Sequence, residues 1–489
     1  MLLGLSATAS GQSSSTHDPT WWDKFQLMST DGPDLSAGAT SSAAVGKNVD
    51  VSNECGPQSE TFITLDPNRP NVLAAGSNEI FRLPMRGYFS TDGGATWGGV
   101  DLPLPPPRGA SGSVFASDPT VAFDTLGNVF YGYIVVHFSP NRGLGLGFKG
   151  TGVAVARSSD GGRTYPFANF FSFEGGENHF NDKPMITADT SPSSPFRDNV
   201  YIAWDAASGG SPGGGIRVAA SSDHGATFTI TRADNPFGPG RSIGTSPFVG
   251  PNGELFVAWN DFAANAIVFN RSFDAGATWG TPTTIASKTI PFDIAIPAEF
   301  VRRALVYPSC GADRSSGAHR GRLYCSWLDL GADGGSNIFL SFSDDQGQSW
   351  TSPAPVPDAF PFVVDRFNHW MSVDPVTGDV NVAFYDTRND TTGMRFMTDY
   401  YFAQSRDGGL TFLSPNTRVS TVSSNEHDCN GLFPCPAINY GNQQGDYEGL
   451  VSFGGVSHPI WTDSRRQLEP ATGCRRPFLM EEVFTATVK

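Results

Sequence analysis

An eight-residue pattern occurs six times along this chain of 489 residues. It reads Ser, any residue, Asp, any residue, Gly, any residue, Thr or Ser, aromatic, and its first copy runs from Ser90 to Trp97. The aspartates of the six copies are Asp92, Asp160, Asp223, Asp274, Asp345 and Asp407. Self-similarity at a spacing of 51 to 71 residues indicates a fold built from stacked supersecondary units.

Each copy of the pattern follows one apolar run and precedes another, which predicts a hairpin turn. Asp and Ser side chains can bond nearby backbone N–H groups in such a turn, and Gly supplies the residue with positive φ. The final aromatic residue offers a large apolar group to a neighbouring sheet. We therefore expect all six copies to have a structural role.

This pattern is the Asp-box, and the chain resembles the sialidase superfamily of β-propellers. The resemblance implies an all-β propeller in which the boxes lie at the outer rim, away from a central site. It also implies a glycoside hydrolase that acts on glycans.

A second repeat lies between the boxes and predicts seven blades. Each unit opens with an apolar run that ends near Asp, Gly or Asn, and a second run often ends in an aromatic residue and Asp. The openings are Thr61–Asp66, Thr120–Asp124, Met185–Asp189, Ser246–Gly250, Ala304–Tyr307, Trp370–Asp374 and Glu448–Phe453. A six-bladed ring is the alternative if one unit is an insertion.

The two ends of the chain are predicted to share the last blade. The seventh unit has no box, and Asn48–Asn53 resembles the end of the sixth unit around Thr417. We expect this N-terminal strand to complete the seventh blade, because a closed ring leaves only short protected sheet edges. The predicted domains are a signal remnant and N-terminal arm at 1–42 and a single propeller at 43–489.

Composition excludes several classes of partner. The net charge of −16 argues against nucleic acid and anionic membranes as partners. No apolar run reaches the length of a membrane-spanning helix. No long pattern with the period of an α-helix is present, so helix content is expected to be very low.

The N-terminus and the cysteines predict a secreted or extracellular protein. Met1–Gln12 is a short apolar run followed by small residues, as at the end of a secretory signal. The six cysteines allow fifteen pairings. Topology favours Cys310–Cys325, Cys429–Cys435 and Cys55–Cys474, the last of which would join the first and seventh blades. No cysteine or histidine spacing indicates zinc.

The candidate site is the funnel where the innermost strands begin. Aligning the openings brings chemically active side chains to this mouth: Glu60, Asp118, Asp182, Lys183, Arg302, Arg303, Asn368, His369, Asp446, Tyr447 and Glu448, with His179 and Arg366 from the preceding loops. Charged groups that converge in a concave place indicate a binding or catalytic site. Strand starts that are simply solvated are the alternative.

The resemblance implies roles for these residues. Sialidases use a tyrosine nucleophile activated by a glutamate, arginines that grip the substrate carboxylate, and an aspartate as acid/base. The resemblance places Tyr447 as the nucleophile and Asp118 or Asp182 as the acid. Arg302 or Arg303, together with Arg366, would supply two of the arginines that bind the carboxylate. His179, Lys183, His369, Asp446 and Glu448 are the further substrate-binding candidates.

The sequence departs from the family pattern in two places. Phe81-Arg82-Leu83-Pro84 resembles the family's arginine motif but lies directly before the first box, outside the expected strand. Glu448 follows Tyr447, so on a strand it points to the opposite face and cannot activate that tyrosine.

Several functions remain open at this point. The preferred interpretation is a sialidase-like enzyme acting on acidic glycans; a polysaccharide lyase and a non-catalytic propeller that binds glycan or protein are alternatives. None of these requires a cofactor. Calcium between Glu60, Asp118, Asp182 and Asp446 is compatible with each of them. The sequence does not predict the oligomeric state.

Overall fold

The computed structural model describes most of the chain. The described residues are 43–52, 57–79, 83–108, 113–138, 148–174, 181–206, 214–234, 242–299, 303–426, 444–465 and 481–489. The predicted signal segment, the motif at Phe81-Arg82, His179, Arg302 and the cysteine pairs other than Cys310–Cys325 lie wholly or partly outside them.

Seven antiparallel sheets form a seven-bladed β-propeller, as predicted. From the inside outwards, blade 1 holds β2 (Gln58–Asp66), β3 (Arg69–Glu79), β4 (Arg86–Ser90) and β5 (Gly98–Asp101), and blade 2 holds β6 (Ser113–Phe123), β7 (Val129–Phe138), β8 (Phe148–Ser158) and β9 (Phe167–Glu174). Blade 3 holds β10 (Asn181–Ala188), β11 (Val200–Ala206), β12 (Gly215–Ser221) and β13 (Thr229–Arg232), and blade 4 holds β14 (Ser242–Val249), β15 (Leu255–Asp261), β16 (Ala266–Ser272) and β17 (Thr283–Ser287). Blade 5 holds β20 (Ser309–Ala312), β21 (Leu323–Leu330), β22 (Ser336–Ser343) and β23 (Ala354–Pro355), and blade 6 holds β24 (Arg366–Val373), β25 (Val380–Asp386), β26 (Met397–Ser405) and β27 (Thr417–Arg418), with β28 (Ser424–Asn425) also on β26.

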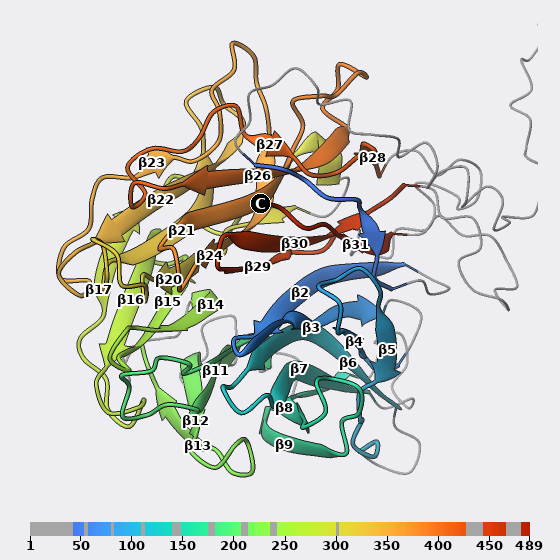
Figure 1. The fold of residues 1–489 in the computed structure, drawn as a ribbon, viewed down its shortest axis with the longest axis vertical. Helices are drawn as coiled ribbons and strands as arrows, with labels where there is room; N and C mark the ends of the chain where they lie inside the picture. Colours follow the sequence, from blue (N-terminus) through green and yellow to red (C-terminus); the bar gives the residue numbers. More distant parts are fainter. Residues whose placement is uncertain are drawn as a thin grey trace, which may run out of the picture.

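The seventh blade joins both ends of the chain. Strands β29 (Gly449–Phe453), β30 (Val456–Asp463) and β31 (Glu482–Thr485) are completed by β1 (Val49–Asp50). Val49 pairs with Thr485, and Val45 forms a further bridge to Val488. Figure 1 shows the blue N-terminal strand beside the red C-terminal one. Each innermost strand packs against the next, and β29 packs against β2, so the ring is closed as the sequence predicted.

The six boxes form one hydrogen-bonded turn, repeated. In the third copy, the Ser221 hydroxyl donates to Asp223 Oδ1 at 2.8 Å, and the Gly225 N–H donates to Ser221 Oγ at 2.8 Å. Thr227 donates to Asp223 from its N–H at 2.9 Å and from its hydroxyl at 2.6 Å. These bonds, the Thr227 hydroxyl first, lower the pKa of Asp223 to about 2.

The aromatic residues that end the third, fourth and fifth boxes contact the preceding blade. Phe228 stacks on Phe171 of blade 2 with ring centroids 4.9 Å apart, and Trp350 meets Phe269 of blade 4 edge-on at 5.6 Å. The Trp279 indole donates to the Thr231 hydroxyl of blade 3 at 2.9 Å. The boxes therefore fasten neighbouring blades to one another.

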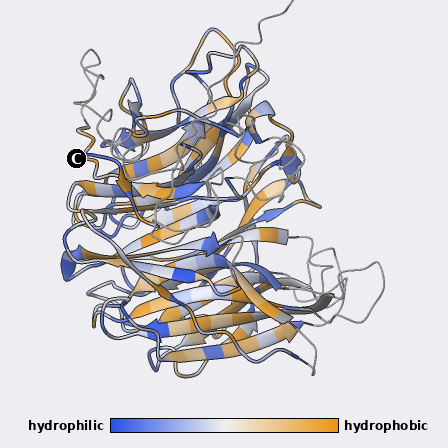
Figure 2. Cartoon of the chain, turned by 90° about the vertical axis from the view of Figure 1, so that its right-hand side faces the viewer, coloured by the Kyte–Doolittle hydropathy of each residue, from blue (hydrophilic) through white to orange (hydrophobic). Residues whose placement is uncertain are grey.

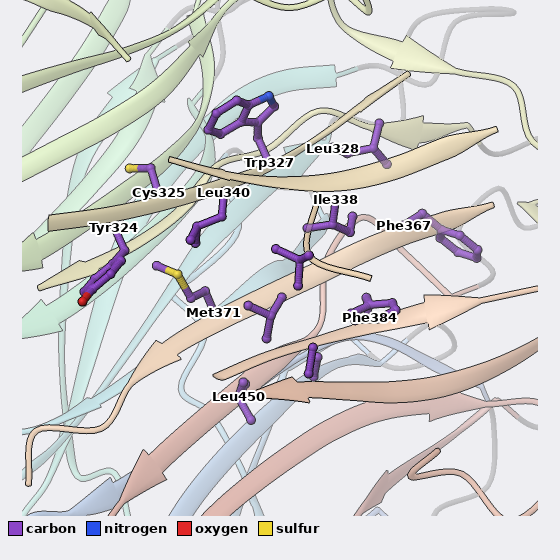
Figure 3. Close-up of a cluster of buried hydrophobic side chains, with 14 of the residues drawn as sticks. Tyr324, Cys325, Trp327, Leu328, Ile338, Leu340, Phe367, Met371, Phe384 and Leu450 are labelled. Carbon is purple, nitrogen blue, oxygen red and sulfur yellow. The ribbon is translucent and has the colours of Figure 1, made fainter. Parts of the chain in front are cut away.

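Apolar side chains fill the spaces between blades. Figure 2 shows apolar residues running along strands of neighbouring sheets, and Figure 3 shows one such cluster, in which Trp327, Met371 and Leu450 come from blades 5, 6 and 7. Four tryptophans of the second strands are fully buried: Trp204, Trp259, Trp327 and Trp461. Each contributes on the order of 2–3 kcal/mol of apolar burial. The described residues contain one short 3₁₀ helix, Pro297–Glu299, and no helix in them is long and apolar enough to cross a membrane.

Blade 5 begins later than the sequence predicted. Ala304–Leu305 forms β19, which pairs with β18 (Asp293–Ile294) in a separate two-stranded sheet, and the innermost strand is Ser309–Ala312. The prediction failed because this inserted hairpin carries an apolar run like those that open the other blades. The predicted disulfide Cys310–Cys325 is confirmed, and its two residues lie directly opposite each other on β20 and β21.

Candidate functional site

Bulges in the innermost strands build the centre of the ring. In five blades the pairing between first and second strand shifts register near the strand start. One residue at each shift has a positive φ: Glu60, Asp118, Lys183, Gly244 and Asn368. Such bulges re-aim a side chain, and they hold non-glycine residues in an uncommon backbone region only where the surroundings enforce it. Charged groups from separate blades are thus brought together.

Lys183 is the hub of this centre. Its ammonium lies 3.1 Å from Glu60 Oε1 and 2.5 Å from Asp446 Oδ2, with Asp118 Oδ2 at 3.9 Å. The ammonium also lies 4.8 Å from the ring centre of Tyr447. Burial opposes the charged form, but the Asp118, Asp446 and Glu60 carboxylates outweigh it and raise the pKa of Lys183 well above its usual value. Blades 1, 2, 3 and 7 are joined through this one cation.

Asp118 and Asp182 form a carboxyl pair beside the hub. The backbone N–H of Lys183 donates to Asp118 Oδ2 at 3.2 Å and to Asp182 Oδ1 at 3.1 Å, and the two carboxyl groups hydrogen-bond each other. Burial, and then the charge of Asp118, raise the pKa of Asp182 well above its usual value. Asp118 is 5% exposed, whereas Asp182 is only partly buried. Burial and the neighbouring charge therefore both favour the protonated form of Asp182.

Tyr447, the predicted nucleophile, is buried, and its ring lies beside the Lys183 ammonium. Its hydroxyl donates to the Pro119 carbonyl at 2.9 Å, and its ring packs with Phe62 and Trp370. Burial, followed by the charges of Glu60 and Asp118, raises its pKa well above 10. This environment stabilises the neutral phenol, the opposite of what a tyrosine nucleophile needs.

Glu448 lies on the opposite face from Tyr447, as expected. It is fully buried and accepts hydrogen bonds from the Tyr385 hydroxyl at 2.7 Å, the Thr462 hydroxyl at 2.6 Å and the Thr61 side chain. Burial raises the pKa of Glu448 to about 7, although these bonds work the other way. Glu448 thus joins blades 1, 6 and 7 rather than contributing to the funnel.

The predicted arginine and histidine ligands that the structure describes are engaged elsewhere. Arg303 belongs to the inserted hairpin, where it is half exposed and pairs with Asp293 at 2.8 Å. Arg366 is buried within blade 6 and pairs with Asp386 at 3.2 Å. His369 contacts the Ser326 hydroxyl at 2.9 Å, and burial lowers its pKa to about 4. The sequence placed these three residues by their position along a strand. Position along a strand does not specify which face of the sheet a side chain takes.

Two residues that complete the centre, Asn78 and Tyr307, were not among the side chains that the sequence placed at the mouth. The Asn78 side chain donates to Glu60 Oε2 at 2.9 Å and accepts the Asp118 N–H at 2.8 Å. The Tyr307 hydroxyl donates to Asp446 Oδ2 at 3.4 Å. A Cβ at Gly244 would overlap the Tyr307 ring, so glycine is required at that bulge. A polar residue ending the second strand of blade 1 was the only sequence signal for Asn78.

The described residues contain no group of three or more His, Cys, Asp or Glu side chains arranged to hold a metal ion. The Lys183 ammonium lies among the axial carboxylates where calcium was expected. Calcium stays a prediction.

Comparisons with known proteins return similarity in structure only. No family model matches the chain, and no curated protein matches it in sequence. Among solved structures, it is similar to a leech intramolecular trans-sialidase (13% identity, TM-score 0.46, covering 72% of this chain and 68% of the other). It is also similar to an intramolecular trans-sialidase from Ruminococcus gnavus (13%, 0.45, 66% and 89%) and to the endosialidase of phage phi92 (12%, 0.46, 91% and 69%). At such values the likeness is no basis for assigning an activity.

The fold itself, a ring of seven antiparallel blades, rests on the sheet topology.

Proposed function

We propose that the protein is a glycoside hydrolase whose acid/base group is Asp182, paired with Asp118 at the mouth of the propeller. The observation that carries this proposal is the hydrogen-bonded carboxyl pair, in which burial and the charge of Asp118 raise the pKa of the partly buried member, Asp182. Glycosidic bond cleavage needs a carboxylic acid that is still protonated at the working pH to protonate the leaving oxygen.

The neighbouring groups support this assignment. Lys183 holds Asp118 from one side, while Ser117 donates to Asp118 Oδ1 at 2.7 Å and Asn78 accepts its N–H. These contacts fix Asp118 in place, so that its charge acts on Asp182. Asp118 is therefore a positioning residue, and Asp182 is the group that would reach a substrate.

The substrate class is a further part of the proposal. An acidic glycan is favoured by the resemblance of the boxes to those of sialidases, and the protein is proposed to act outside the cell for the same reason. Lys183 does not serve as the ligand of an acidic sugar here, because its ammonium is occupied by Glu60 and Asp446.

The test is hydrolysis of a panel of fluorogenic glycosides, both acidic and neutral, by the unaltered protein and by Asp182→Asn. General acid catalysis contributes about 10²–10⁴-fold, so the variant should lose activity by that factor. Activity of the unaltered protein should fall as pH rises through the raised pKa of Asp182. An active Asp182→Asn protein would disprove the assignment. The matched control is Asp234→Asn, at a buried carboxyl group outside the pair.

A non-catalytic glycan-binding propeller is the second candidate. The observation that favours it is the Tyr447 hydroxyl, which is committed to a backbone carbonyl rather than to a base. Glycan binding retained by a protein that hydrolyses none of the panel would support this candidate over the enzyme.

A further inference from the structure

A hollow lies on the outer strands of blade 2. It has a volume of about 460 Å³ and is bounded by strands β7, β8 and β9 and by residues 105–108. Small-molecule sites commonly measure about 300–1,000 Å³ and combine apolar walls with a few polar groups. None of its lining residues belongs to the Asp118–Asp182 pair or to its surroundings.

One of the strand residues that line the hollow is a glycine. Gly152 on β8 lies opposite Val135 on β7, and a Cβ built there would meet the Phe171 carbonyl oxygen at 3.7 Å and Phe173 Cδ2 at 3.9 Å. These are ordinary contact distances, so a larger residue would fit by filling the space.

The prolines form a wall that is held in place. The Tyr133 hydroxyl donates to the Pro103 carbonyl at 2.6 Å, and the Tyr133 ring meets Phe170 edge-on at 6.4 Å. Pro105, Pro106 and Pro107 follow along one side of the hollow, and the phenylalanines of β9 line the other.

Two polar groups meet at one end of these walls. The guanidinium carbon of Arg108 lies 3.6 Å from the ring centre of Phe173, which fixes the plane of the guanidinium group. His137 lies against the same ring, with centroids 5.6 Å apart. The imidazole is 4% exposed, and its Nδ1 has no hydrogen-bond partner among the described residues. A buried nitrogen left without a partner costs about 1–3 kcal/mol, which a ligand could recover.

We propose that this hollow binds a small carboxylate with an apolar body, whose carboxylate contacts Arg108 and His137 and whose body lies between the prolines and Phe170. A planar carboxylate matches the fork of N–H groups on arginine and can accept two parallel hydrogen bonds from it. The aromatic and proline walls suit an aryl or short alkyl group.

The charge state of His137 agrees with this choice. Burial, and then the charge of Arg108, lower the pKa of His137. The imidazole is therefore neutral near pH 7, and one tautomer donates from Nδ1 to a carboxylate. A bound anion would offset the charge of Arg108 and raise this pKa.

The experiment titrates phenylacetate into the full chain and follows binding by calorimetry, with phenylacetamide as the uncharged probe. We expect saturable binding of phenylacetate, and binding of the amide weaker by at least about tenfold, because the charge-assisted bond is lost. Arg108→Gln should weaken phenylacetate binding by a similar factor. Arg157→Gln is the control, because Arg157 lies over Phe167, another phenylalanine of β9, and neither residue lines the hollow. This variant should bind phenylacetate as tightly as the unaltered protein does.

A second pair of variants tests the space itself. Gly152→Leu should abolish phenylacetate binding because the leucine side chain fills the hollow. Gly152→Ala adds only a methyl group and should retain most of the binding. The NMR pKa of His137 should rise when phenylacetate binds, a result that a purely structural role for Arg108 would not produce. Unchanged binding in Gly152→Leu, or no saturable binding of phenylacetate, benzoate or hexanoate to the unaltered protein, would overturn the proposal. Arg108→Gln should leave glycoside hydrolysis intact, so the two proposals fail separately.

Discussion

The aspartates of the rim and those of the axis show opposite chemistry. At the rim, Asp92, Asp160, Asp223 and Asp274 are exposed and Asp345 and Asp407 are partly buried, and hydroxyl and N–H donors lower the pKa of all six. At the axis, burial and a neighbouring carboxylate raise the pKa of Asp182. The rim repeats one local turn six times, whereas each axial residue has different partners from other blades. Local hydrogen bonds keep a carboxylate charged, and convergence of the chain makes a carboxyl group hold its proton.

The largest effect should come from removing the axial cation. Lys183→Met leaves the carboxylates of Glu60 and Asp446 buried without their ammonium, and breaking such a pair costs about 3–5 kcal/mol of unfolding free energy. Urea denaturation measures the loss. Lys47→Met, at an exposed lysine near the rim, should cost almost nothing, and Lys183→Arg should restore part of the stability. Equal stability of Lys183→Met and the unaltered protein would mean that the axial charges are not coupled.

The next effect is a pH dependence set by Glu448. Its pKa is raised to about 7 from an unfolded value of 4.5, so its contribution is fully present below pH 4.5 and is lost as pH rises through 7. The loss should be on the order of 3 kcal/mol. Denaturation at a series of pH values should show this decline, and Glu448→Gln should remove it. If Glu448→Gln shows the same decline, the loss of stability belongs to another group. The control is Glu254→Gln, at a buried glutamate of blade 4, which should keep the decline.

Tyr447 offers a smaller effect that separates structure from catalysis. Tyr447→Phe removes the hydroxyl bonded to the Pro119 carbonyl and should cost about 1–2 kcal/mol of stability. Because that hydroxyl is not free to attack a sugar, the turnover rate on any glycoside that the unaltered protein cleaves should stay within a few-fold. Complete loss of turnover in a folded variant would identify Tyr447 as the nucleophile instead.

The smallest effect should come from a single box. Asp223→Ala removes one exposed set of hydrogen bonds and should cost about 1 kcal/mol at neutral pH. The contribution of Asp223 is present above pH 3.8 and is lost as pH falls through about 2, because its pKa is lowered in the folded protein. Thermal unfolding measures this loss. The control is Thr229→Ala, at an exposed residue on the adjoining strand, whose unfolding temperature should stay near that of the unaltered protein. A loss as large as that of Lys183→Met would remove the distinction between rim and axis.

Much of the candidate site could be read from strand positions, but not its contacts. The position of each blade opening predicted that Asp118, Asp182, Lys183 and Asp446 converge, and they do. The same reasoning failed for Arg366, because a shift of one residue on a strand sends a side chain to the other face. It failed for Arg303 because an inserted hairpin imitates a blade opening.

The sequence by itself determined the ring: the boxes, the paired apolar runs and the N-terminal strand are local patterns, and each one specifies its own turn or strand. Only the tertiary structure decided that Lys183 is the common partner of the axial carboxylates, that the pKa of Asp182 is raised and that Tyr447 faces the Pro119 carbonyl. These properties depend on bulges in separate blades and on the exclusion of water between them. Distances between groups far apart in the chain, and the burial that sets their charge, arise only once the ring has closed.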